Sequence, residues 1–317
     1  MRRAVVALAA LVLVAGCAKG QDTASTGGAP LTLGGTTSTS SADGEVGKGL
    51  GAATSGTEVG TAVAVSGTVT YQGYRITAAD GAFDDARDEL RIPLEVENLG
   101  PDDSTFYGDS IVLDTGGPEP IGGSVTAPPA IAPGATTAAI VVFYLTDGLS
   151  MIEGDTTALV LGATGHQQAR IPLGGSGTVV TRDPIAQATP ADVTIGTVTL
   201  APEDLEVRYD DVVQHTQAET GTAYLVLHAK ATNAAKDQTW YVGTDQATLA
   251  LPDGTSSAAD AFTSEAPALE PGATTDVWLR WTIPDTFAGQ ATITFAADWG
   301  ADGAPATAPM AITVTTS

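Results

Sequence analysis

The sequence predicts an all-β protein built from two tandem antiparallel β-sandwiches. From about residue 64 onward, short segments rich in Val, Ile, Thr and Leu alternate with Gly, Pro, Asp and Asn turns. We find no convincing long amphipathic helix in this part of the chain, and several segments recur in the same order. A repeat of about 110–125 residues favours the immunoglobulin-like sandwich, which takes about 100 residues, over a barrel.

Two segments show the alternation expected of strands with one buried face. In residues 90–97 and again in residues 225–232, apolar and more polar side chains alternate with a period of two. Pro93 interrupts the first segment, and a proline has no N–H to donate to a neighbouring strand. We therefore expect the first strand to lie at a sheet edge or beside a bulge.

The order of the recurring segments predicts a duplicated domain. The pairs are 67–70 and 196–199, the strands ending at Asn98 and Asn233, Phe106-Tyr107 and Trp240-Tyr241, and the identical strings 133–137 and 271–275. One shared string arises easily by chance, but a series in constant order does not. The predicted domains are residues 64–175 and 190–317, joined by a linker at 176–189.

The first seventeen residues have the pattern of an export signal. Arg2 and Arg3 precede an apolar run at 4–14, which is shorter than the roughly 20 residues that span a bilayer. Ala15, Gly16 and Cys17 then resemble the lipobox of bacterial lipoproteins, in which the cysteine receives a lipid and becomes the new N-terminus. An ordinary signal peptide with a chance cysteine is the alternative. The resemblance implies a protein anchored by Cys17 to the outer face of the cell membrane.

The segment after Cys17 is predicted to be a flexible tether. Residues 17–63 contain mostly Gly, Ser, Thr and Ala, without an apolar period or an aromatic side chain. Because Cys17 is the single cysteine of the chain, we expect no disulfide and no thiolate metal site. The sandwiches must then be stable through their cores alone.

Charge excludes one class of partner. The chain has 37 acidic and 13 basic residues and a formal net charge of −24. No cluster of Lys and Arg offsets this balance locally, so the composition argues against binding to nucleic acid.

The strand pattern also resembles a known group of domains. In both repeats a strand ends in Asn, and a loop, a second strand and a Pro-Gly pair precede a long apolar strand. This order resembles the immunoglobulin-like domain of exported lipoproteins of Gram-positive bacteria and mycobacteria, the immunoprotective-antigen superfamily. The resemblance covers both repeats and implies an antiparallel sandwich and an extracytoplasmic location. It implies no agreed activity.

One segment resembles a catalytic motif. Residues 106–111 resemble the nucleophile block of GDS-type esterases, with Ser110 as the nucleophile. That family has an α/β fold and needs an Asp three residues before a catalytic His. The residues three before His166, His215 and His228 are Ala163, Val212 and Leu225. Since a serine without a base is inert, we expect no enzyme.

An acidic loop and the three histidines are the remaining candidates for a ligand or metal site. Asp84, Asp85 and Asp88 crowd one loop, and hard cations such as Ca²⁺ need several oxygen ligands at one point. The loop has no EF-hand spacing, and a solvated acidic loop is the alternative. The three histidines are widely spaced, so the sequence predicts no Zn or Cu site and no cofactor.

The strand around residue 280 carries the predicted partner surface. Trp278 and Arg280 should face outward, while Leu279, Trp281 and Ile283 face the core. Outward aromatic and Arg side chains are typical of interface anchors. Alternatively, the guanidinium stacks on the indole, or a loop covers Trp278. Phe143 should be the inward counterpart of Trp281 in the first repeat.

These features predict a non-catalytic, lipid-anchored, extracytoplasmic protein that binds or supports an envelope protein or a wall component through its sandwiches. The alternatives are a small-ligand or calcium-binding lipoprotein that uses the acidic loops, and a GDS-type esterase.

Overall fold

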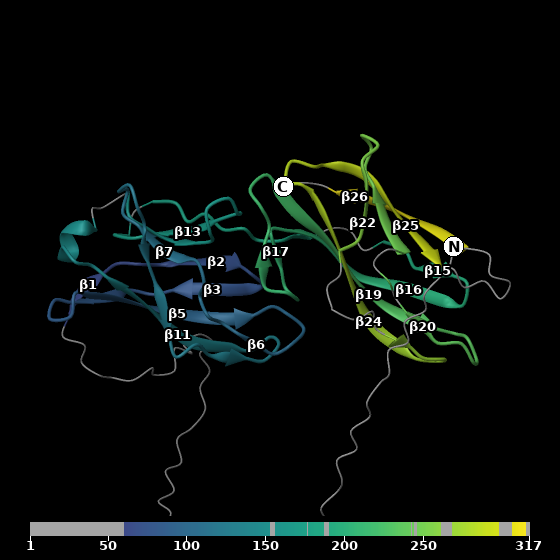
Figure 1. Cartoon of the computed structure of the whole chain (residues 1–317), viewed down its shortest axis with the longest axis horizontal. Helices are drawn as coiled ribbons and strands as arrows, with labels where there is room; N and C mark the ends of the chain where they lie inside the picture. The colour runs from purple at the N-terminus through teal and green to yellow at the C-terminus, as the bar shows by residue number, and fades with distance from the viewer. Residues whose placement is uncertain are drawn as a thin grey trace, which may run out of the picture. The chain divides into compact units, whose positions relative to one another are not determined.

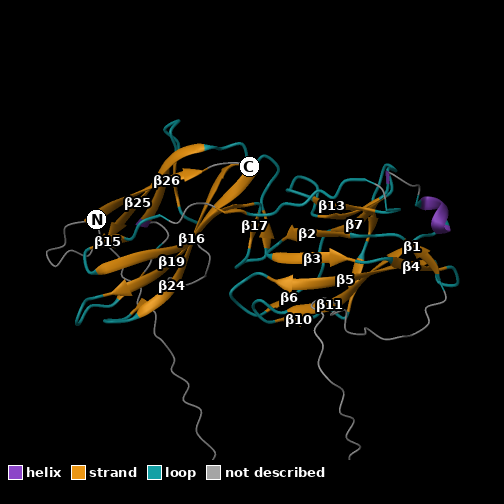
Figure 2. Cartoon of the chain, turned by 180° about the vertical axis from the view of Figure 1, so that it is seen from behind, coloured by secondary structure: helices purple, strands orange, loops and turns teal. Residues whose placement is uncertain are grey.

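The computed structural model describes residues 60–152, 156–175, 177–186, 190–241, 243, 246–260, 268–297 and 306–314. The predicted signal peptide, Cys17 and the tether through residue 59 lie outside these residues. Among the described residues, strands account for almost all of the regular structure, and η1 (Gly148–Met151) is a short 3₁₀ turn (Figure 2). Within this described part, no helix is long and apolar enough to cross a membrane. The all-β prediction is confirmed.

The first repeat forms two antiparallel sheets (Figure 1). One contains β1 (Thr61–Val63), β2 (Gly67–Tyr71), β3 (Tyr74–Ala78), β4 (Gly81–Asp84), β5 (Glu89–Asn98), β9 (Ser124–Thr126) and β11 (Thr136–Tyr144). The other contains β7 (Ile111–Asp114), β8 (Ile121–Gly122), β12 (Ala158–Leu161) and β13 (Ala169–Pro172). The short strands β6 (Ser104–Thr105) and β10 (Ala130–Ile131) pair with each other.

The second repeat has the same plan. One sheet contains β14 (Ile185–Ala186), β15 (Val193–Ile195), β16 (Val198–Arg208), β19 (Thr222–Asn233) and β24 (Thr274–Pro284). The other contains β21 (Ala247–Ala250), β22 (Ser256–Ala258), β25 (Gly289–Ala297) and β26 (Ala306–Val314). Two short pairs complete it, β17 (Asp210–Asp211) with β18 (Thr216–Gln217) and β20 (Trp240–Tyr241) with β23 (Ala268–Leu269).

The strand order is that of an immunoglobulin-type sandwich. In the first repeat one sheet runs β3/β4-β5-β11-β9 and the other β8-β7-β12-β13. Lettered in chain order, these are the sheets A-B-E-D and C′-C-F-G. In the second repeat β16-β19-β24 and β22-β21-β25-β26 correspond to A-B-E and C′-C-F-G. The predicted sandwich class is therefore confirmed from the connectivity itself.

Each sandwich has its own hydrophobic core, and the predicted inward faces are buried. Phe143 on β11 is fully buried in the first core, and Trp281 on β24 is fully buried in the second. The Trp281 indole N–H donates to the Ala247 carbonyl at 3.3 Å and so joins β24 to the opposite sheet. The predicted alternation in residues 90–97 agrees with the burial of β5, and that in 225–232 agrees with the burial of β19 except at Val226, which is buried although it was predicted on the polar face.

The expectation for Pro93 was wrong in one respect. β5 is a central strand, with β11 on one side and β3 and β4 on the other. Pro93 lies where the neighbour changes from β3 to β4, and there its carbonyl accepts a hydrogen bond from Ala79 N–H. The missing N–H of proline is therefore tolerated at a break in the ladder rather than at a sheet edge.

Two predicted connections carry more structure than expected. Thr61–Val63, assigned to the end of the tether, form β1 and pair with β4. In the predicted linker, Val180 bridges to Arg170, and Asp183 accepts a hydrogen bond from the Thr70 hydroxyl at 2.8 Å. Ile185–Ala186 then pair with β16. The described part of the linker is thus held by strands of both repeats.

A buried asparagine ends the B strand of each repeat. The Asn98 amide donates to the carbonyls of Asp102 and Ile131, and its oxygen accepts from Gly100 N–H. Asn233 repeats these contacts with the carbonyls of Gln238 and Leu269 and the N–H of Ala235. Both side chains are almost fully buried, and buried polar groups are hydrogen-bonded, so these bonds satisfy each amide at the end of its strand.

The identical strings 133–137 and 271–275 meet these asparagines. Gly134 N–H donates to the Asn98 carbonyl, and Gly272 N–H donates to the Asn233 carbonyl. Gly134 has a φ of 66° and Gly272 a φ of 74°, a conformation that glycine adopts without strain. The repeated letters therefore reflect one turn that is built twice.

Candidate functional site

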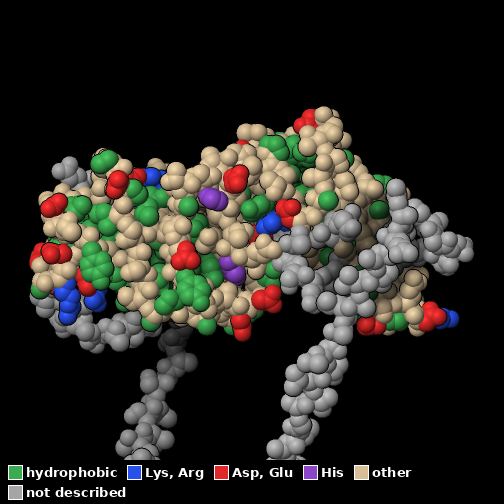
Figure 3. All heavy atoms as spheres, viewed as in Figure 1, with side chains coloured by type: hydrophobic (Ala, Val, Ile, Leu, Met, Phe, Trp, Pro, Cys, Tyr) green, Lys and Arg blue, Asp and Glu red, His purple; other side chains and the backbone are tan. Residues whose placement is uncertain are grey.

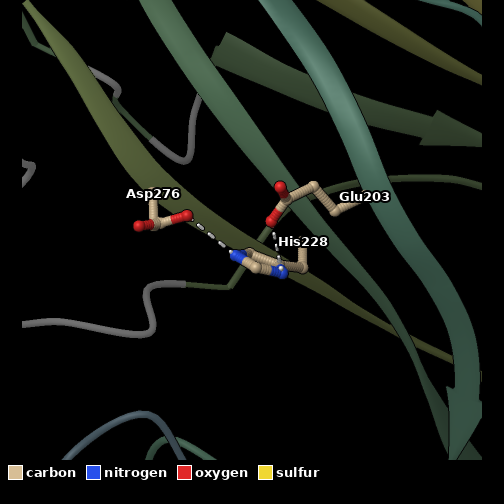
Figure 4. Close-up of side chains that lie close together, drawn as sticks. All are labelled: Glu203, His228 and Asp276. Atoms are coloured by element: carbon tan, nitrogen blue, oxygen red, sulfur yellow. Dashed lines mark hydrogen bonds and ion pairs between the residues drawn. The ribbon is translucent and has the colours of Figure 1, made fainter.

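Three neighbouring strands of the second sandwich bring ligand-type side chains together. Glu203 lies on β16, His228 on β19 and Asp276 on β24 (Figure 4). Each of the three offers one potential ligand atom, a ring nitrogen of His228 or a carboxylate oxygen, and these atoms all lie within 4.8 Å of one another. Among the described residues, this is the group of three or more His, Cys, Asp or Glu side chains that could hold a metal ion.

Strand register explains this convergence. His228 pairs with Asp204 on one side and with Trp278 on the other, so these positions form a row across the outward face. The register of β16 shifts between Pro202 and Asp204, and Glu203 occupies this bulge. Because a bulge re-aims a side chain, it directs Glu203 toward the imidazole of the neighbouring strand.

The imidazole lies between carboxylates. Its Nε2 is 3.1 Å from Asp276 Oδ1, and its Nδ1 is 3.5 Å from Glu203 Oε2. Asp204 Oδ2 lies 3.9 Å from Nδ1. The His228 side chain is 17% exposed, while the carboxylates around it are more open to solvent. Both ring nitrogens thus have an acidic neighbour at the protein surface.

Lys230 and Trp278 complete the cluster. Lys230 Nζ donates to Glu203 and is 3.9 Å from Asp276 Oδ1, so an ammonium group lies close to both carboxylates. The hydrogen bond to Glu203 raises the pKa of Lys230. The Trp278 indole stacks on the imidazole with 4.1 Å between centroids and 9° between planes. The indole therefore limits the rotation of the histidine ring.

An imidazole and two carboxylates are a donor set that divalent transition metals accept in proteins. The spacing of the histidines along the chain pointed away from such a site. His228 and Asp276 are 48 residues apart, and only the β19–β24 register brings them together. The available signal was the position of His228 on the polar face of its strand.

The predicted partner-surface residues lie on the outward face but do not stack on each other. Arg280 lies over the Tyr224 ring at 4.5 Å and pairs with Asp211 and Asp260. These contacts leave its side chain 12% exposed. The suggested guanidinium–indole stack is wrong, because Trp278 stacks on His228 instead.

Ser110 is not supported as an esterase nucleophile. It lies in the turn before β7 with a φ of 65°. Its hydroxyl is hydrogen-bonded to Tyr71, and burial, together with the charge of Asp109, raises the pKa of Tyr71 to about 12. This phenol is protonated at neutral pH and is no general base. The all-β fold also differs from the α/β fold that the resemblance implied.

In the acidic loop predicted as a calcium site, the Asp84 carboxylate is bound by neighbouring groups of the same loop. One oxygen of the Asp84 carboxylate accepts from Ala86 N–H at 3.0 Å, and the other pairs with Arg87 at 2.9 Å. Asp88 has a positive φ of 55°. Asp84, Asp85 and Asp88 are not among the convergent ligand groups of the described residues.

A shallow hollow opens on the sheet of β7, β12 and β13. Ser110, Val112, Asp114, Gln168 and Arg170 are among its lining residues. Arg170 pairs with Asp114 at 2.8 Å. The Gly116 N–H and then Arg170 hold the pKa of Asp114 below its usual value. Arg170 and Asp114, two charged side chains of this hollow, thus bind each other.

The described residues include contacts between the two repeats around Gly73 and Asp210. Gly73 N–H, in the turn between β2 and β3, donates to the Asp210 carboxylate at 2.6 Å. Burial raises the pKa of Asp210, while Arg208 and this N–H lower it. His215 stacks on Tyr74 with 4.6 Å between centroids. His215 is therefore occupied in a structural contact.

Each repeat has an exposed tyrosine after its B strand, but the two tyrosines differ in strand register. Leu269 pairs with Trp240, whereas its counterpart Ile131 pairs with Ser104, so Tyr241 corresponds to Thr105 in the ladder and Tyr107 lies two residues further on. Tyr107 is 62% exposed and Tyr241 is 59% exposed. Each follows an aromatic residue that is almost fully buried, Phe106 or Trp240. Figure 3 shows one face of the molecule, where acidic side chains are spread widely and hydrophobic ones lie between them.

Comparisons with known proteins identify no family. No family model and no curated protein matches the sequence. A solved structure of a conserved domain protein from Bacillus anthracis is similar over 81% of this chain and 92% of that chain, at 11% identity and a TM-score of 0.27. The fold assignment above rests on strand order and not on this similarity.

Proposed function

We propose that the chain is an exported, lipid-anchored, non-catalytic binding protein of the cell envelope. The anchoring part draws on residues 1–17, where an apolar run precedes Ala15, Gly16 and the single cysteine, Cys17. This pattern resembles a lipobox, and the repeats resemble the sandwich domains of the immunoprotective-antigen superfamily. The partner is an envelope protein or a wall component at the outer face of the membrane.

One exposed tyrosine in each repeat, Tyr107 and Tyr241, is the observation that carries the binding part. Both repeats have a buried aromatic residue followed by an exposed tyrosine in the segment after the B strand, although the two pairs differ in strand register. A solvated tyrosine contributes little to the core of its own sandwich. Tyrosine is enriched at interface hot spots because it offers a large apolar ring with a polar end. Tyr107 and Tyr241 are therefore the favoured contact points for a partner, one in each repeat.

Replacement of the lipidated cysteine tests the anchoring. Wild-type protein should enter the detergent phase on phase separation, because acyl chains supply the membrane affinity. Cys17→Ser should move the protein to the aqueous phase or the medium. Equal partition of the two proteins into detergent would contradict the lipid anchor.

A photo-crosslinking amino acid at Tyr107 or Tyr241, introduced in intact cells, tests the contact points. Both positions should give the same higher-mass product. The matched controls are Ser124 and Ser257, which are exposed and lie on β9 and β22 of the two repeats. A product from the tyrosine positions alone supports the proposal. No product, or equal products from the control positions, contradicts it.

A further inference from the structure

The histidine cluster lies on the outward face of β16, β19 and β24 in the second repeat. The matching face of the first repeat has different residues at these positions. The β5–β11 register pairs Pro93 with Ile140, and the β19–β24 register pairs His228 with Trp278. Two residues further along, Glu95 faces Ala138, while Lys230 faces Asp276. The first repeat thus has proline and alanine where the second has histidine and aspartate.

This difference shows that the cluster is not part of what both sandwiches need in order to fold. A sandwich of the same strand order forms without the imidazole and without the aspartate, so the fold does not require the cluster. The second repeat nevertheless has a histidine, two flanking carboxylates and an aromatic ring against the imidazole. These groups together need a reason beyond the stability of the sheet.

We propose that Glu203, His228 and Asp276 form a binding site for a divalent transition-metal ion of the Zn²⁺ type. This inference goes beyond the proposed function and does not depend on it. The ligand atoms lie within 4.8 Å of one another, and zinc binds nitrogen and carboxylate oxygen at about 2.0–2.2 Å. For an ion at Nε2, the exposed Glu203 carboxylate, which lies 3.5 Å from Nδ1, has to turn toward Nε2 and Asp276. Three protein ligands leave a fourth position open to water or to another molecule.

The lysine marks the position of the ion. Lys230 places its ammonium beside Glu203 and 3.9 Å from Asp276, and Asp276 in turn contacts His228 Nε2. A metal ion held by the three ligands takes over this cationic position. Lys230 is 48% exposed and has a flexible stem, so it can release the carboxylates into solvent. Lys230 is therefore a competitor of the ion and not a ligand.

The remaining neighbours orient the imidazole. Metal-binding histidines usually donate their second ring N–H to a carboxylate or carbonyl, which fixes the ring. Here Nε2 faces Asp276 at 3.1 Å, while Nδ1 faces Glu203 at 3.5 Å and Asp204 at 3.9 Å, so Asp204 stays beside Nδ1 when Glu203 turns to the ion. Trp278 covers one face of the ring. The ring is thus held before any ion binds, which lowers the entropic cost of binding.

Titration of the untagged full chain with Co²⁺ tests this site. The protein carries Cys17→Ser, because Cys17 is its single thiol. One equivalent of Co²⁺ should give visible d–d absorption, and Zn²⁺ should displace it. His228→Gln and Asp276→Asn should each weaken binding by roughly 100-fold, since even outer partners of a ligand are worth roughly 10–100-fold. His166→Gln is the matched control, because His166 is exposed and far along the chain from the cluster.

The Lys230→Ala variant should change the Co²⁺ affinity in the opposite direction to the two ligand variants. Loss of the competing charge should tighten Co²⁺ binding by roughly tenfold. A lysine that only supports the local structure would not have this effect. Circular dichroism confirms that each variant is folded, and the half-exposed Asp276 keeps the test valid if His228→Gln unfolds. Absence of Co²⁺ binding below millimolar concentration, or binding that survives both ligand variants, would overturn the proposal.

Discussion

The His228 imidazole and the Trp278 indole lie parallel, with ring centroids 4.1 Å apart, on the outward side of the second sandwich. Three residues further along β24, Trp281 is fully buried on the inward side. One strand thus carries two tryptophans with different roles. One fixes a surface histidine, and the other fills the core and joins the two sheets through its N–H.

The two tryptophans should differ in their effect on stability. Trp281→Ala empties a large core site and is expected to cost about 3–5 kcal/mol, a typical value for a buried aromatic residue. Trp278→Ala removes a surface stack and should cost about 1 kcal/mol, in the range measured for aromatic pairs. Chemical denaturation of both variants measures this. A larger loss for Trp278→Ala would contradict the register of β24.

Replacing either asparagine at the end of a B strand by aspartate, which has nearly the same shape, should destabilise the protein. Asn98→Asp replaces the amide that donates to two buried carbonyls by a group that, when ionised, can only accept. Unsatisfied buried groups cost about 1–3 kcal/mol each. Asn233→Asp should behave in the same way, because its contacts are equivalent.

The pH dependence of Asn98→Asp has a definite sign. Burial beside carbonyls raises the pKa of the new carboxyl in the folded state. The variant should therefore be closest to wild type below the unfolded pKa of about 3.9. It should lose stability, relative to wild type, as pH rises through the folded pKa. Asn98→Ala is the control, and its stability difference from wild type should be nearly independent of pH. A flat difference for the aspartate variant would contradict the buried amide contacts.

Asp114 should give the opposite pH dependence. The Gly116 N–H and Arg170 lower its pKa, so ionised Asp114 stabilises the fold above the unfolded pKa, and this contribution is lost as pH falls through the folded pKa. NMR titration of the carboxyl measures the pKa directly. Arg170→Ala should raise the pKa only part of the way to its usual value, because the first cause, the Gly116 N–H, remains. An unchanged pKa in this variant would rule out the Arg170 contribution.

The connection between the repeats should resist trypsin until it is released from β2. Asp183 accepts hydrogen bonds from Thr70 and Thr181, both at 2.8 Å, and so holds the chain beside Arg182. Thr70→Val removes one of these bonds without altering the cleavage sequence. Cleavage after Arg182 should become faster, because proteolysis follows local opening.

Thr68→Val on the same strand is the control for this experiment. Its hydroxyl bonds to Thr77 at 2.9 Å and has no role in the connection. Equal cleavage rates for the Thr70 and Thr68 variants would show that the Asp183 contact does not limit opening.

The sequence predicted features that depend on a single strand. Alternation along 90–97 and 225–232 identified the buried faces, and the recurring strings predicted two sandwiches of one kind. Features that depend on two strands were missed. The place of Pro93 in a central strand required knowledge of where β3 ends and β4 begins. The histidine cluster required the register of three strands, since a shift of one residue would turn every side chain to the other face.

The turns that contain Gly134 and Gly272 also bear on the order of folding. Each closes the end of a long B–E ladder at which the paired residues are closest along the chain. Asn98 and Asn233 bind carbonyls only 33 and 36 residues away at this end. Closing the smaller loop first loses less chain entropy, and each further residue pair can then form beside an existing one. The turn and the asparagine together thus favour initiation of each B–E ladder from the same end.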